Sequence, residues 1–388
     1  MRNFTFYNPT KIIFGAEREA DFAREVAKLG KKALVVTGGG SVKRNGIFDT
    51  IVEALKDADV AIVEESGISP NPRLNEVKDG IRIARQENVD VILAIGGGST
   101  IDAAKLMAVG VPTDAEPWDI VLGKVKPERA LPLATVLTLA ATGSEMDPSS
   151  VITNLETQEK YGWGSPLVYP AVSLENPAFT TTVNAWHTAA GTADIMSHVM
   201  EQYFTLDDRA YVADSLAEGI LRTAIHFGPV AIAEPDDLEA RGNLMWASSL
   251  ALNGLLSIGK DYPWSVHDME HELSAKYDIT HGVGLAILTP HWLNHVLNKK
   301  TAPRIARFAR NVFGIQEADD VACAKAGIEA LSAFFASLHI PMHLKDVDID
   351  ESRLEEMAED LANYRHGVID GFQPLHKEDI LAIYKAAL

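Results

Sequence analysis

The sequence predicts an α/β domain followed by an all-helical domain. In the first half, short runs rich in β-branched residues alternate with amphipathic stretches. Near residue 184 this alternation gives way to residues that recur at helical spacing. A chain of 388 residues also exceeds what one hydrophobic core usually fills. We therefore expect two domains, residues 1–183 and residues 184–388.

The order of the elements in the first half predicts a parallel sheet. Strand, helix and strand in succession form right-handed βαβ units, and helices then cover both faces of the sheet. The N-terminal segment resembles the start of a strand. Strands are expected at 32–37, 59–63, 89–95, 133–139 and 151–153, and helices at 47–56, in a run to about 86 and in a run from 99. In the second half, AGTADIMSHVMEQYF, DSLAEGILRTAIHF and RGNLMWASSLALNGLL are typical of helices.

The composition excludes several classes of partner and site. With 54 acidic against 35 basic residues, the net charge is −19, so we expect neither nucleic acid nor an anionic membrane as a partner. The single cysteine, Cys323, allows no intramolecular disulfide and no cysteine-based metal cluster. No window resembles a signal peptide or a membrane-spanning helix. We expect a cytoplasmic protein.

Two glycine triplets, Gly38–Gly40 and Gly96–Gly98, each join an expected strand to an expected helix. Glycines let a ligand approach the backbone N–H groups, and a helix N-terminus attracts a pyrophosphate. A tight turn without a ligand is the alternative, but two such turns at the ends of parallel strands favour a ligand. Lys43 and Ile101 occupy the positions of the third glycine, so the ordinary dinucleotide fingerprint is absent.

Polar residues surround the second triplet. Asp102 lies near the start of its helix, where the helix dipole stabilises a carboxylate without any function. Lys105, one turn later, is interpreted as a solvated surface residue. Thr138 and residues 141–145 form a third turn rich in hydroxyl groups, for which an ordinary capped loop is the alternative.

A set of acidic and imidazole side chains in the second half indicates a metal site. Asp194 and His198 are four residues apart, so they lie on one helix face and either share a cation or pair with each other. His267 and His271 repeat this spacing, and His281 follows in a loop. Carboxylate and imidazole together suit zinc or ferrous iron. A metal site of this kind uses three or four of these five side chains, and the spacing alone does not show which of them bind the metal.

Together the motifs resemble the iron-containing (group III) alcohol dehydrogenases, which have a dehydroquinate synthase-like fold. The resemblance covers essentially the whole chain and rests on GGGSTIDAAK, TGSE, AGTADIMSHVME, HDMEHELSA and THGVGLAILTP. The stretches GGGSVKRNGI, MWASSLALNGLL and HELSAKYDITHG are typical of the butanol dehydrogenase and broad-specificity aldehyde reductase subgroup. The resemblance implies a Rossmann-like N-terminal domain, and hydride transfer between NAD(P)H and short-chain aldehydes such as butanal.

The resemblance also assigns roles to individual residues. It implies that His271 lies near the nicotinamide without binding the metal, and acts as a proton relay. Asp102 is implied to lie beside the nicotinamide and the substrate. The implied metal ligands are Asp194, His198, His267 and His281, and the implied coenzyme-binding residues are Gly38, Gly39, Gly40, Ser41, Asn71, Gly97, Gly98, Ser99, Thr138, Thr142, Ser144 and Lys160.

Two positions depart from the family pattern. Many relatives carry an aspartate after the first strand of the coenzyme fold, whereas residues 37–41 contain no acid. A carboxylate there would repel a 2′-phosphate, so its absence, with Ser41 and Lys43 nearby, slightly favours NADP over NAD. Leu285 replaces a common asparagine and changes the polarity of the pocket. The ligand types accept either Fe²⁺ or Zn²⁺.

Two other functions compete with the dehydrogenase interpretation. A lyase of the dehydroquinate synthase-like fold would also combine a nucleotide with a metal. A metal-binding structural or regulatory protein is the third hypothesis, but it leaves the glycine turns without a purpose. The expected partner is a small alcohol or aldehyde, and the strands near the N-terminus allow a homodimer.

Overall fold

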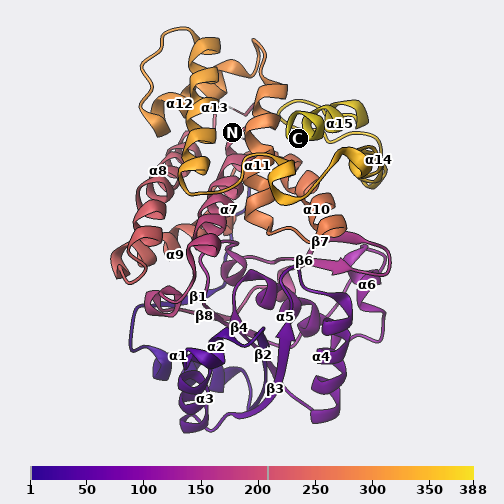
Figure 1. The fold of residues 1–388 in the computed structure, drawn as a ribbon. Coiled ribbons are helices and arrows are strands. Elements are labelled where there is room, and N and C mark those ends of the chain that lie inside the picture. Colours follow the sequence, from indigo (N-terminus) through magenta and orange to yellow (C-terminus); the bar gives the residue numbers. More distant parts are fainter. Residues whose placement is uncertain (1, 208) are drawn as a thin grey trace. The chain divides into compact units, whose positions relative to one another are not determined.

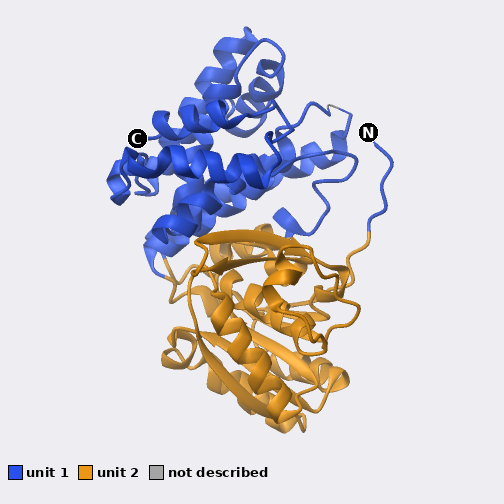
Figure 2. Cartoon of the chain, turned by 90° about the vertical axis from the view of Figure 1, so that its right-hand side faces the viewer, with its two compact units in different colours: residues 1–6, 184–234, 250–388 blue, residues 7–183, 235–249 orange. Residues whose placement is uncertain are grey.

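The computed structural model describes residues 2–207 and 209–388. The chain forms two compact units, residues 7–183 with 235–249, and residues 1–6 with 184–234 and 250–388 (Figure 2). The sequence predicts residues 235–249 as part of the helical domain, whereas in the structure they group with the α/β unit. The reason is packing, because Met245 of this segment belongs to the hydrophobic core beneath the sheet.

The α/β unit is built on a six-stranded parallel sheet with the strand order β1-β8-β5-β4-β2-β3 (Figure 1). The predicted strand near residue 151 does not join this sheet, because it pairs with the following strand in a separate antiparallel hairpin, β6-β7. The strands are β1 (Lys11–Phe14), β2 (Lys32–Gly38), β3 (Ala61–Ile68), β4 (Val91–Gly96), β5 (Leu133–Leu137), β6 (Ser149–Asn154), β7 (Glu159–Gly164) and β8 (Val172–Glu175).

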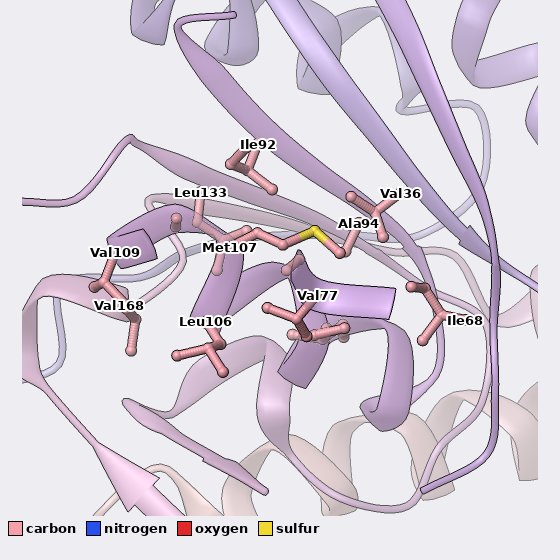
Figure 3. Packing of buried hydrophobic residues seen from close by; sticks show 14 of the residues in the cluster. Val36, Ile68, Val77, Ile92, Ala94, Leu106, Met107, Val109, Leu133 and Val168 are labelled. Carbon is pink, nitrogen blue, oxygen red and sulfur yellow. The ribbon is translucent and has the colours of Figure 1, made fainter. Parts of the chain in front are cut away.

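Alternate side chains of each central strand enter two different cores. In β2, Leu34 and Val36 pack with helices α4 and α5, whereas Ala33 and Val35 pack with α1 and α3. Figure 3 shows Val36 and other strand residues beside Met107 of α5. A sheet buried on both faces explains why its strands are continuously apolar. The helices of this unit are α1 (Glu19–Leu29), α2 (Ser41–Arg44), α3 (Ile47–Asp57), α4 (Leu74–Glu87), α5 (Gly98–Gly110) and α6 (Pro117–Val121).

The helical unit is arranged around α7. From Thr188 to Tyr203 every residue of this helix is buried, and the side chain of Asn184 caps its first turn by accepting a hydrogen bond from His187 N. None of the described helices has the length and hydropathy needed to span a bilayer. The helices of the second half are α7 (Ala185–Tyr203), α8 (Tyr211–Ala233), α9 (Leu238–Leu252), α10 (Ser265–Tyr277), α11 (His281–Val296), α12 (Ala302–Phe313), α13 (Asp320–Ser337), α14 (Leu354–Tyr364) and α15 (Lys377–Ala386).

Candidate active site

Three of the predicted metal-binding side chains converge within the helical unit. Asp194 lies on α7, His267 on α10, and His281 is the first residue of α11. Asp194 Oδ1 is 4.0 Å from His267 Nε2 and 3.9 Å from His281 Nε2. One ligand atom from each residue lies within 4.8 Å of the other two. One carboxylate and two imidazoles at this spacing can hold one divalent cation.

Close packing of two helices brings these residues together. A Cβ atom on Gly282 would lie 2.0 Å from the carbonyl oxygen of Ala190 on α7. Only glycine therefore lets the first turn of α11 touch α7, and this contact carries the neighbouring His281 towards Asp194. Along α7 itself, residues four apart share a face, which places His198 beside Asp194.

His198 is oriented differently from the other two histidines. Its Nδ1 lies 3.0 Å from the backbone oxygen of Asp194 and 3.2 Å from that residue's Oδ1. Its ring centroid is 4.6 Å from that of His267. Burial lowers the pKa of His198 to about 4, against the opposing effect of Asp194. The imidazole is thus neutral at neutral pH, as a metal ligand must be.

Two buried glutamates contact the outer nitrogens of the histidines. Glu201 Oε1 accepts hydrogen bonds from the backbone N–H groups of Val266 and His267 and lies 3.3 Å from His267 Nδ1. Glu270 pairs in the same way with Nδ1 of His281. Neither glutamate was predicted as a site residue, although each stands three residues after a candidate ligand on the same helix, a spacing that could have identified them. Such carboxylates orient metal-binding imidazoles.

His271 lies apart from the Asp194 group. Its ring centroid is 5.6 Å from that of His281, and it forms a second potential ligand group with Glu270 and His281. It is partly exposed, in contrast to the buried His267 on the same helix. Its position next to the cluster fits the relay role that the resemblance implies, and that role stays a prediction.

Trp264 packs beside the imidazole cluster. Its ring centroid is 5.0 Å from that of His267 and 5.8 Å from that of His198, both edge to face. Its backbone has φ of 64° and ψ of 44°, a left-handed conformation that costs free energy in a bulky residue.

The two glycine turns of the α/β unit lie at the same edge of the sheet. The first follows β2 and the second follows β4, and these strands are parallel neighbours. The second turn begins the thirteen-residue helix α5, whereas the first begins the four-residue α2. Gly97 and Ser99 are partly exposed, and Gly98 is buried against Thr142, whose Cγ2 would be 2.3 Å from a Cβ there. The N–H groups of α5 thus face an edge at which a pyrophosphate can bind.

Two other predicted coenzyme residues contact each other, and a third is held beside the second glycine turn. Lys160 Nζ donates a hydrogen bond to Asn71 Oδ1 over 2.9 Å, and both side chains are buried. Thr138 N donates to the backbone oxygen of Gly96, which holds the hydroxyl-rich turn beside the second glycine turn. At the first turn, Gly39 and Ser41 are exposed.

Comparison with known proteins places this geometry in a family. The descriptions "Iron-containing alcohol dehydrogenase" and "Fe-containing alcohol dehydrogenase family, C-terminal" match residues 9–177 and 188–388. The chain belongs to the iron-containing alcohol dehydrogenase family. As a member of this family it is an oxidoreductase that interconverts alcohols and aldehydes, with NAD(P)H and a divalent metal.

Similarity to individual iron-containing alcohol dehydrogenases extends over whole chains. NADH-dependent butanol dehydrogenase A of Clostridium acetobutylicum is 50% identical over 99% of both chains. NADPH-dependent aldehyde reductase YqhD of Escherichia coli is 36% identical over 94% of both. The crystal structure of NADH-dependent butanol dehydrogenase A from Thermotoga maritima is 37% identical, covers 100% of this chain and 99% of its own, and superposes with a TM-score of 0.96.

A buried polar network in this alcohol dehydrogenase corrects one prediction. Lys105 is fully buried rather than solvated, because its Nζ lies 2.6 Å from Asp147 Oδ1 and donates to Ser144 Oγ over 2.8 Å. Ser144 in turn donates to Asp102 Oδ1 over 2.6 Å, and Val151 N donates to Asp102 Oδ2. Burial raises the pKa of Asp102 to about 6, while Lys105 and Ser144 oppose the rise.

Proposed function

We propose that this enzyme reduces short-chain aldehydes such as butanal to alcohols, and catalyses the reverse oxidation. The observation that carries the proposal is the convergence of Asp194, His267 and His281. The names of the butanol dehydrogenases and aldehyde reductases similar to the chain support the substrate class. A cytoplasmic location and a homodimer, both predicted from the sequence, remain part of the proposal.

A divalent cation fits the chemistry of the cluster. Asp194, His198, His267 and His281 would hold it, and one carboxylate with three imidazoles suits Fe²⁺ and Zn²⁺ alike. When bound, such a cation would supply Lewis-acid polarisation of an aldehyde's carbonyl group, and NAD(P)H would supply the hydride.

The chain's own carboxylates prepare the ligands. Glu201 would accept a hydrogen bond from Nδ1–H of His267, and Glu270 one from Nδ1–H of His281, so both rings would keep the Nε2 lone pair towards Asp194. This arrangement fixes the tautomer and the angle of each ring before a cation binds. His271, beside His281, would hold the proton that the product oxygen takes up, which makes it a candidate general acid.

The α/β unit would hold the coenzyme at the edge formed by the ends of β2 and β4. The turn Gly97–Ser99 at the start of α5 would bind the pyrophosphate, and the Gly38–Ser41 turn would face the adenosine. Lys160 and Asn71 would contact the coenzyme as a pair. Lys43 lies beside the first turn and pairs with Glu64. Without an acid at residues 37–41, we favour NADPH slightly over NADH.

Coenzyme consumption with butanal tests the proposal. The enzyme, loaded with Fe²⁺ or Zn²⁺, is expected to oxidise NADPH or NADH when butanal is added, and His271→Ala should retain the metal but lose about 10²–10⁴-fold in rate. The matched control is His226→Ala, on α8 and outside both histidine groups. Coenzyme binding without consumption by the metal-loaded wild type would contradict the proposal, and unchanged turnover of His271→Ala would remove that residue from the reaction.

A further inference from the structure

Two buried glutamates of the α/β unit contact one serine hydroxyl. Glu145 lies in the turn η1 (Ser144–Met146), Glu175 ends β8, and Ser249 lies on α9. Ser249 Oγ is 2.5 Å from Glu145 Oε1 and 2.9 Å from Glu175 Oε1. All three residues have an exposed fraction of 0%, and neither the metal cluster nor the proposed coenzyme contacts use these carboxyl groups.

The hydrogens available for these two contacts indicate that Glu145 and Glu175 are not both ionised. A serine hydroxyl has one hydrogen and can donate one hydrogen bond. Two ionised carboxylates can only accept, so one of the two short contacts would have no hydrogen. If one carboxyl group is protonated, it donates to Ser249 Oγ, and the hydroxyl donates to the other. The geometry therefore requires at least one neutral carboxyl group at this position.

The surroundings of the pair also disfavour two negative charges. The second oxygen, Oε2, of both Glu145 and Glu175 is buried without a hydrogen-bond partner among the described residues. The neighbouring charges that act on Glu145 are Lys105 of α5, Asp147 after η1 and Glu175 itself. Lys105 is already engaged by Asp147. Burial raises the pKa of Glu145 to about 7 and holds that of Glu175 well above its ordinary value.

We propose that Glu145, Glu175 and Ser249 form a protonated latch that fastens residues 235–249 to the sheet and holds the turn at residues 141–145 in place. The three residues come from segments that are far apart in the sequence. Residues 235–249 are thus held to the α/β unit by two kinds of contact. The latch supplies the polar one, and Met245 supplies the apolar one.

The backbone of the latch is anchored as well. Ser173 Oγ donates to the backbone oxygen of Glu145 over 2.6 Å, and Thr135 Oγ1 donates to Ser173 Oγ over 2.7 Å. Because Thr142 and Ser144 precede Glu145 in the same turn, releasing the latch would also displace residues assigned to coenzyme binding. That last consequence rests on the proposed function, whereas the latch itself does not.

The latch has a defined pH dependence. The folded pKa of Glu145 lies above the ordinary value of 4.5, so the folded state binds the proton more tightly than the unfolded state. The stabilisation is complete below about pH 4.5 and is lost as the pH rises through about 7. At alkaline pH both carboxyl groups become charged, and residues 141–145 and 235–249 loosen before the rest of the unit.

Glu145→Gln tests the latch, because a neutral amide mimics the protonated carboxyl group and can donate to Ser249. Between pH 6 and pH 9 the melting temperature of the metal-loaded wild type should fall more than that of Glu145→Gln, by roughly 2–4 °C. Glu239→Gln, an exposed glutamate on α9, the helix that carries Ser249, is the matched control and should follow the wild type. Equal slopes for the wild type and Glu145→Gln would overturn the latch, and Glu175→Gln provides the same test if Glu145→Gln does not fold.

Hydrogen exchange gives a local readout. After correction for intrinsic exchange, residues 141–145 and 235–249 of the wild type should lose protection at pH 9 about tenfold or more relative to pH 6, since one pKa unit corresponds to tenfold. In Glu145→Gln they should remain protected. Loss of protection at pH 9 to the same extent in both proteins would contradict the latch. The melting temperature and hydrogen exchange are measured without substrate, so neither result depends on catalytic activity. An inactive enzyme would therefore refute the proposed function and leave the latch intact.

Discussion

In the helical unit, the buried carboxylates Glu201 and Glu270 face imidazoles, whereas in the α/β unit Asp147 faces the ammonium of Lys105. An imidazole that gives one N–H to a carboxylate keeps a second nitrogen with a lone pair, so the pair can still bind a cation. An ammonium has only donors, and those of Lys105 end on Asp147, Ser144 and the backbone oxygen of Ser149. The group that faces a buried carboxylate thus decides whether the pair can still bind a metal, as with an imidazole, or only stabilises the fold, as with an ammonium.

Removing the metal-facing carboxylate should give the largest effect. Asp194→Ala takes away the acidic ligand and is expected to abolish metal binding. Activity should fall about a thousandfold, because several kcal/mol of Lewis-acid stabilisation disappear. The measurements are elemental analysis and turnover. The control is Asp261→Ala, an acid of the same unit whose side chain is 72% exposed. Full metal occupancy in Asp194→Ala would count against the ligand set.

Removing the ammonium from the α/β unit should reduce stability instead of metal content. Lys105→Met leaves Asp147 buried without its cation, which is expected to lower the free energy of unfolding by about 3–5 kcal/mol. Urea denaturation measures this loss. Lys124→Met removes a pair with Asp119 whose lysine is 63% exposed, and should cost below about 1 kcal/mol. A comparably small loss for Lys105→Met would show that burial does not govern the pair.

Neutralising the carboxylates behind the histidines should have an intermediate effect. Glu201→Gln and Glu270→Gln keep the shape of the side chain but lose the charge that orients each ring, so metal affinity should fall about 10–100-fold. Titration of the metal-free protein with Co²⁺ measures the affinity, and the visible spectrum of the bound ion reports its geometry. Glu218→Gln is the control, because this buried glutamate of the same unit contacts Tyr203 and Arg307 instead of a histidine. Equal affinities in all three variants would refute the orienting role.

The smallest effect is expected at the exposed ion pair beside the first glycine turn. Lys43 pairs with Glu64, and both side chains are more than one third exposed, so Lys43→Gln should change stability by less than about 1 kcal/mol. If the lysine contacts a 2′-phosphate, KM for NADPH should rise about 2–5-fold, as expected for a solvated charge pair, while KM for NADH stays constant. The matched control is Lys11→Gln, at another exposed ion pair. A parallel rise for both coenzymes would remove Lys43 from coenzyme selection.

The predicted strands and helices near the glycine turns correspond to observed elements because their patterns are local. Apolar runs and glycine triplets predicted β2, β4 and the start of α5, and helical periodicity predicted α7. The hairpin partner of β6 was missed, because which strand pairs with which depends on contacts beyond the neighbouring residues. Lys105 was assigned to the surface because a lysine is usually solvated, and only the position of Asp147 overrides that preference.

Helical geometry and motif order are properties of the chain alone, so the residues suffice to predict the two classes of domain, the helix face shared by Asp194 and His198, and the family motifs. Three features depend on the packing of the folded chain: the imidazoles that converge on Asp194, the meeting of Glu145 and Glu175 at Ser249, and the packing of residues 235–249 with the sheet. These contacts join segments distant in the sequence, and their burial sets whether a given acid is ionised, neutral or paired.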